Sequence, residues 1–120
     1  MKILFFALLL SLSSHALEYS KKLKYPDKIA MASYYSNALH GHKTASGERY
    51  NKGLLTAAHR SLPFGTLVRV TMLSTGKQVI VKINDRGPFM RRRGIDLSYK
   101  AAKTIGMVRA GVGKVKLEVL

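Results

Sequence analysis

The chain has 120 residues, no cysteine, and 21 lysines and arginines against 6 aspartates and glutamates, which gives a formal net charge of +15. The absence of cysteine excludes a disulfide framework, a thiolate metal site, a cysteine nucleophile and a lipid anchor on an N-terminal cysteine. This length predicts one domain, and the basic excess predicts an acidic partner unless it serves only solubility.

The first residues have the pattern of a signal peptide. Lys2 supplies a positive charge, an apolar run occupies residues 3–10, and Ser14-His15-Ala16 places small residues at the two positions that a signal peptidase reads. The run is shorter than the roughly 20 apolar residues that a membrane span needs. We therefore predict a signal peptide over 1–16 and an exported mature chain, periplasmic or secreted, with no lipid anchor and no transmembrane segment.

Export would limit the acidic partner to polymers that are present outside the cytoplasm. Removal of Lys2 leaves 20 basic against 6 acidic residues, a mature charge of +14. Peptidoglycan, anionic lipids and lipopolysaccharide are the acidic polymers outside the cytoplasm, where little nucleic acid is met. We expect no nucleic-acid partner, and a basic nucleic-acid-binding barrel stays an alternative that cell fractionation would test.

The rest of the chain has the pattern of a small β protein. A flexible basic lead-in is predicted over 17–28, and the folded domain over 29–120. Short apolar runs bounded by turn residues then predict strands over 30–35, 54–58, 66–73, 78–84 and 115–119. The third and fourth runs alternate, with Val68, Val70 and Met72 on one face of the first and Val79, Val81 and Ile83 on the core face of the second. They form the clearest hairpin.

One helix is evident near the C-terminal end, over 99–105. Ser98 is a natural N-cap and Gly106 fits the position after the last turn. The apolar stripe consists of Leu97, Ala101, Ala102 and Ile105. About six short strands with one or two short helices predict a mainly β fold, a small closed barrel.

Three polar segments are candidates for a functional site. The first is the loop 40–51, the second is 56–60, where His59 ends an apolar run, and the third holds Asp85 at a strand end and Asp96 beside a helix start. Two carboxylates and a histidine suit general acid–base chemistry. Turn and capping chemistry account for the same aspartates equally well.

A metal site at the histidines is disfavoured. His40 and His42 have a spacing that suits one face of a strand, and His59 is a third candidate ligand. The neighbouring Lys43 and the basic surroundings repel a cation. We predict no metal and no cofactor.

Several motifs together resemble the rare lipoprotein A family of double-psi β-barrel domains. The similarity covers nearly the whole chain beyond Met31. It runs in order through Ala32-Ser33-Tyr34-Tyr35, TASGERYN (44–51), LTAAHRSLPFGTLVRV (55–70), INDRGPF (83–89), GIDLS (94–98) and GVGKVKLEVL (111–120).

This resemblance implies a six-stranded double-psi β-barrel and a lytic transglycosylase. Such an enzyme cuts the bond between N-acetylmuramic acid and N-acetylglucosamine in peptide-free peptidoglycan strands and leaves 1,6-anhydro ends. The family's groove acids fall on Glu48, Asp85 and Asp96, with His59 beside them. The expected partner is the denuded glycan strand, bound by a monomer.

The roles of the site residues follow from that chemistry. We predict Asp85 as acid and base, because Asp96 would be partly held by the helix start, and Asp96 as the catalytic group that tunes it. Glu48 and His59 would bind sugar. The remaining substrate-binding residues are Tyr34, Thr44, Ser46, Asn51 and Arg86, although only one of Tyr34 and Tyr35 can face the groove.

The sequence departs from the family at several places. It has no lipobox cysteine and no C-terminal peptidoglycan-binding repeat domain, Ser36 replaces a frequent glycine, and Asn51 stands where many members have aspartate. The loss of that carboxylate favours the alternative function, an expansin-like module that binds a polysaccharide without cutting it.

Overall fold

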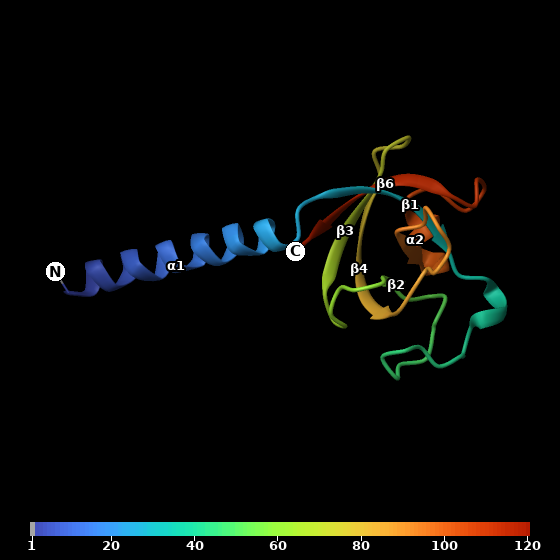
Figure 1. Cartoon of the computed structure of the whole chain (residues 1–120), viewed down its shortest axis with the longest axis horizontal. Helices are drawn as coiled ribbons and strands as arrows, with labels where there is room; N and C mark the ends of the chain where they lie inside the picture. Colours follow the sequence, from blue (N-terminus) through green and yellow to red (C-terminus); the bar gives the residue numbers. More distant parts are fainter. Residues whose placement is uncertain (1) are drawn as a thin grey trace.

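The computed structural model describes the backbone of residues 2–120 and the side chains of residues 13–120. It opens with the helix α1 (Lys2–Lys24), which projects away from a small barrel and ends close to the C-terminus (Figure 1), where the Lys21 ammonium donates to the carbonyl of Leu120. In the described part of the chain, no helix combines the length and the apolar character that a membrane crossing needs.

Helix α1 covers the predicted signal peptide and most of the predicted lead-in. The segment predicted as a flexible lead-in is helical as far as Lys24, and the first strand begins at Lys28. The signal peptide over 1–16 stays a prediction, because residue 1 and the side chains of residues 2–12 lie outside the described part.

Six strands close into a barrel, which confirms the predicted architecture. Their spatial order is β1-β5-β2-β4-β3-β6, with β1 and β5 parallel, β2 and β4 parallel, and the other neighbours antiparallel. Closure leaves no strand edge free for pairing with another chain. The strands are β1 (Lys28–Tyr34), β2 (Thr56–Ala58), β3 (Leu67–Met72), β4 (Gln78–Asp85), β5 (Ile95–Leu97) and β6 (Gly113–Val119).

The core follows the alternation seen in the sequence. Each antiparallel strand turns every second side chain inward, so the expected rows of β3 and β4 are buried. Val115 and Leu117 of β6 join them. The hairpin between β3 and β4 pairs Val70 with Val79 and Val68 with Val81, as its alternation predicts.

Strand β5 was not predicted. It has only three residues, of which Ile95 and Leu97 are fully buried, and the sequence there suggests the approach to a helix. Parallel pairing with β1 and antiparallel pairing with β2 fix it in the barrel wall. Gly94 precedes it, and a Cβ at that position would lie 2.6 Å from the Cβ of Ala30, so the close approach of β5 to β1 requires a glycine.

Helix α2 (Tyr99–Thr104) begins and ends close to its predicted bounds. The Ser98 side chain accepts a hydrogen bond from the Ala101 amide, as an N-cap does. The same hydroxyl donates to the carbonyl of Leu54, at 2.6 Å. A short 3₁₀ helix, η1 (Asn37–Leu39), lies in the loop after β1.

Replacement of Ser98 by alanine should therefore destabilise the barrel. The substitution removes the helix cap and leaves the partly buried Leu54 carbonyl without its donor. We expect a loss of about 1–2 kcal/mol in the free energy of unfolding, measured with urea. The matched control, Ser74→Ala at an exposed turn, should change it by less than about 0.5 kcal/mol; equal effects of the two variants would contradict this account.

Candidate active site

Strand pairing brings four side chains into one row across four neighbouring strands. Ser33 of β1 lies opposite Asp96 of β5, Asp96 lies opposite Ala58 of β2, and Ala58 lies opposite Asp85 of β4. Two strand spacings separate the aspartates, so their Cα atoms are about 10 Å apart. The small, buried side chain of Ala58 lies between them.

A bulge turns Asp85 toward this row. The pairing of β2 with β4 shifts after Ala57, which lies opposite Ile83, so Ala58 lies opposite Asp85 and Asn84 is the extra residue. In a regular strand Asp85 would point the same way as Ile83, into the core. The bulge rotates it to the other face, which is a known use of bulges near active sites.

The Asp85 carboxylate is held on both oxygens. Oδ1 accepts from the amides of Ala45 and Arg86, each at 2.9 Å. Oδ2 accepts a short hydrogen bond from the Tyr35 hydroxyl. Three donors from three segments of the chain therefore fix the orientation of this group.

Two stacked tyrosines form a wall beside Asp85. The rings of Tyr35 and Tyr50 are nearly parallel, with centroids 4.3 Å apart, and they pack with Ala58 in a buried cluster separate from the main core. Burial, followed by the hydrogen bond to Asp85, raises the pKa of Tyr35 above its ordinary value. The Tyr35 hydroxyl therefore stays protonated and keeps donating to Asp85.

Asp96 has a different environment. It is partly buried between Ile95 and Leu97, and the Ser33 hydroxyl donates to its Oδ1 at 3.2 Å. Burial, opposed by that hydrogen bond and helped by the nearby charge of Asp85, raises the pKa of Asp96 to about 6. The Asp96 side chain is thus held by strand β1 and not by the start of α2, contrary to the expectation from the sequence.

The loop over 40–51 is ordered by its own polar side chains. The Thr44 hydroxyl donates to the carbonyl of Glu48 at 2.6 Å and lies 2.9 Å from the Ser46 hydroxyl. The Ser46 amide donates to the carbonyl of Asn84, beside the bulge. Thr44 and Ser46 thus shape the loop whose Ala45 amide reaches Asp85, and this use of both hydroxyls was not predicted.

Glu48 lies at the exposed edge of the site. It forms an ion pair with Lys82 at 2.9 Å, and the hydrogen bond to Lys82 lowers the pKa of Glu48. The pair remains accessible to solvent, so Glu48 is free to exchange Lys82 for a ligand at little cost.

His59 and Arg86 adjoin Asp85 through their backbone amides, and their side chains make hydrogen bonds elsewhere. The Nδ1 atom of His59 accepts from the amides of Ser61 and Leu62, at 3.1 Å each. The Arg86 guanidinium donates to the carbonyls of His59 and Leu62 and lies over the ring of Phe64, 4.0 Å from its centroid. Both side chains order the connection between β2 and β3.

Tyr34 and Asn51 also differ from their predicted roles. The Tyr34 hydroxyl donates to the carbonyl of Val108, and the ring packs edge-on against Tyr99. The paired aromatics therefore divide as expected, but Tyr35 and not Tyr34 faces the acids. Asn51 is exposed, and its side-chain oxygen accepts from the Gly53 amide in a local turn.

Sequence reasoning missed Ser33, Ala58 and Tyr50 as parts of the site. Their positions depend on which strands become neighbours, and the parallel pairing of β1 with β5 joins residues 63 positions apart. The only signal was that each of the three lies inside a segment that resembles the family.

Comparison with known proteins identifies the family to which this fold and these motifs belong. A profile of the family described as "Lytic transglycolase" matches residues 28–117. The chain belongs to this family. The match confirms the double-psi β-barrel and the resemblance to the rare lipoprotein A proteins.

Named relatives are similar over most of this chain. The "Probable endolytic peptidoglycan transglycosylase RlpA" of Synechocystis sp. is 55% identical over 93 residues, which cover 78% of this chain and 29% of that protein. The "Endolytic peptidoglycan transglycosylase RlpA" of Campylobacter jejuni is 46% identical over 106 residues, which cover 82% of this chain and 38% of that protein. The chain thus spans well under half the length of these relatives.

A solved structure shares the fold at low sequence identity. A mutant expansin of Clavibacter michiganensis in complex with cellohexaose superposes with a TM-score of 0.64, at 19% identity, over 78% of this chain and half of that one. At this identity the likeness concerns the fold alone.

The raised pKa of Asp96 predicts an unusual dependence of stability on pH. The folded chain holds the Asp96 proton more tightly than the unfolded chain, so the free energy of unfolding should fall as pH rises from about 3.8 to about 6. Asp96→Asn should lessen that fall and be more stable than the wild type at pH 7.5. Urea unfolding at several pH values measures this.

Asp27→Asn, at an exposed aspartate, is the matched control for that measurement. It should leave the pH dependence as in the wild type. If Asp96→Asn is instead less stable than the wild type at pH 7.5, the carboxylate form of Asp96 is stabilised by the fold and the account of its environment is wrong.

Proposed function

We propose that this domain is a lytic transglycosylase that cuts peptide-free peptidoglycan strands between N-acetylmuramic acid and N-acetylglucosamine and leaves 1,6-anhydro ends. The observation that carries the proposal is the pairing of two unlike carboxyl groups across Ala58. Asp96 is partly buried with a raised pKa, and Asp85 is fixed by three donors. The names of the relatives support the same reaction class.

The reaction needs one group that first gives a proton and then takes one. Protonation of the glycosidic oxygen lets the bond to C1 of the muramoyl residue break, with an oxocarbenium-like transition state. The C6 hydroxyl of the same sugar then attacks C1 and loses its proton to the group that acted as acid. The group returns to its starting state, and no water is consumed.

Asp96 suits this part better than Asp85. An acid that works near neutral pH needs a raised pKa, which burial and a neighbouring carboxylate provide at Asp96. Asp85 accepts three hydrogen bonds, an arrangement that suits a carboxylate, and its charge would stabilise the cationic transition state. The roles predicted from the sequence are therefore exchanged in this proposal.

The preference for peptide-free strands rests on charge. Removal of a stem peptide leaves the lactyl group of each muramoyl residue with a free carboxylate, so the denuded strand is an acidic polymer. The chain carries 21 basic residues against 6 acidic ones. Its positive field would draw such a strand toward the site, and salt would weaken that attraction.

An expansin-like binding module is the second candidate. The Clavibacter expansin, which shares this fold over half of its chain, was solved in complex with cellohexaose, so the fold occurs in a protein that binds a chain of sugars. A binding module would retain denuded strands without creating new ends. Identification of the products separates the two functions.

Digestion of purified peptide-free glycan strands, with products identified by mass spectrometry, tests the proposal. The wild type should release fragments with anhydromuramoyl ends. Asp96→Asn should lower the rate by about 10²–10⁴, because it removes a positioned acid and base. Asp85→Asn should also be strongly impaired, whereas the control Asp27→Asn should act like the wild type.

Three results would count against parts of this account. Binding without new anhydromuramoyl ends would identify a binding module. Reducing ends without the anhydro ring would identify a hydrolase. Near-normal turnover by Asp96→Asn together with a dead Asp85→Asn would return the acid–base role to Asp85.

A further inference from the structure

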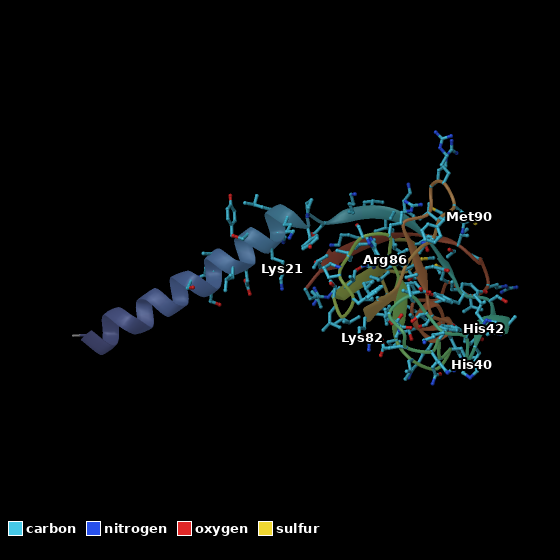
Figure 2. All side chains as sticks on the ribbon, turned by 60° about the horizontal axis from the view of Figure 1, so that its bottom comes forward. Lys21, His40, His42, Lys82, Arg86 and Met90 are labelled. Carbon is cyan, nitrogen blue, oxygen red and sulfur yellow. The ribbon has the colours of Figure 1, made fainter. Side chains whose placement is uncertain are left out.

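The connection between β4 and β5 carries an exposed apolar tip. Phe89 is 82% exposed and Met90 is 64% exposed, and Phe89 is the most exposed large hydrophobic side chain in the described part of the chain. Figure 2 shows Met90 on a loop that projects from the barrel, on the opposite side of the view from His40 and His42. Two adjacent apolar side chains held out in water indicate a contact surface.

The tip is held in place from below. The Arg60 guanidinium, from the connection between β2 and β3, donates to the carbonyl of Pro88 at 2.8 Å and to that of Met90 at 2.7 Å. These two bonds tie the base of the loop to the barrel, so the apolar side chains are presented in a fixed direction.

Basic side chains surround this tip. Arg91 and Arg92 follow Met90 directly and are exposed, and Arg93 comes next in partial burial. Under the loop lies a pocket of about 370 Å³ whose lining includes Lys28, Arg60, Arg92 and Arg93. The described residues that line it include no carboxylate, so its positive charge is not balanced within it.

The pocket also contains a histidine that its surroundings disfavour in the charged form. His59 also lines this pocket, and its pKa is lowered, first by burial and then by the charges of Lys28, Arg86 and Arg60. Burial and then the surrounding cations therefore both favour the neutral form of His59.

We propose that this surface docks the domain on an anionic phospholipid bilayer, with Phe89 and Met90 in the interfacial layer and Arg91, Arg92 and the basic pocket on headgroup phosphates. Apolar side chains beside arginines are the combination that binds such interfaces. A hydrated glycan strand would satisfy the arginines but would give Met90 no apolar surroundings. The proposal goes beyond glycan cleavage and does not depend on it.

Docking through this loop would also position the two aspartates, because the loop connects the strands that carry them. Asp85 precedes the loop and Asp96 follows it. A bilayer bound at the tip would therefore hold the two carboxyl groups at a fixed height above the membrane surface.

Tryptophan fluorescence provides a test that is specific to the tip, because the chain contains no tryptophan. Phe89→Trp should show a blue-shifted emission with vesicles of phosphatidylcholine and phosphatidylglycerol, and quenching when the acyl chains are brominated. Vesicles of phosphatidylcholine alone should give neither effect. Binding through α1 would leave a tryptophan at the tip in water and does not mimic the result.

Matched variants make the outcome decisive. Leu73→Trp, at an exposed leucine in the turn between β3 and β4, should keep its emission unchanged with both vesicles. Arg91→Gln with Arg92→Asn in the Phe89→Trp chain should lose most of the shift; asparagine tolerates the positive φ of 72° at position 92. An unchanged urea midpoint confirms that each variant is folded.

Other outcomes overturn the proposal. An equal shift with the uncharged vesicles removes the role of the arginines, and an equal shift at position 73 removes the role of the tip. A shift with peptide-free glycan strands and none with anionic vesicles would identify the loop as a polysaccharide contact.

Discussion

The bulge between β2 and β4 is the constraint on which the site depends. If the strand were regular through Asn84, the alternation that buries Val79, Val81 and Ile83 would turn Asp85 into the core. With the bulge, Asp85 joins the row that contains Asp96. The Ala45 amide and the Tyr35 hydroxyl then complete a rigid setting for this carboxylate. One local irregularity thus converts a hydrophobic wall into a surface with two acids.

The two aspartates differ because their surroundings differ in donors and in access to water. Asp85 accepts three hydrogen bonds, whereas Asp96 accepts one from Ser33 and is partly buried on the face of β5 opposite to Ile95 and Leu97. Desolvation disfavours the charged form of Asp96, and the charge of Asp85 adds to this effect. In the proposed reaction the two groups therefore have different tasks, since Asp96 transfers the proton in both steps and Asp85 stabilises the cationic transition state.

The sequence predicts the elements whose signal is local. The hairpin of β3 and β4 and the helix capped by Ser98 follow from alternation and capping chemistry. Strand β5 was not predicted, because three residues are too few to show an alternating pattern. Its parallel pairing with β1 joins residues far apart in the sequence, which local patterns do not predict. The outward direction of Asp85 was not predicted either, because alternation along β4 places this side chain on the core side and the bulge has no signal in the sequence. Motif resemblance supplied both aspartates but could not say which of the paired tyrosines faces them, and the role of His59 stays a prediction.

The central claim is that the fold keeps a proton on Asp96 at a pH where an ordinary aspartate has lost it. Carboxyl ¹³C NMR of the uniformly labelled chain, titrated from pH 3 to pH 8, measures this for each aspartate separately. We expect Asp96 to titrate with a pKa of about 6, and with a lower value in Asp85→Asn, because that variant removes the neighbouring charge. A pKa of Asp96 near 3.8, the ordinary value for aspartate, would contradict the account and leave the site without its acid.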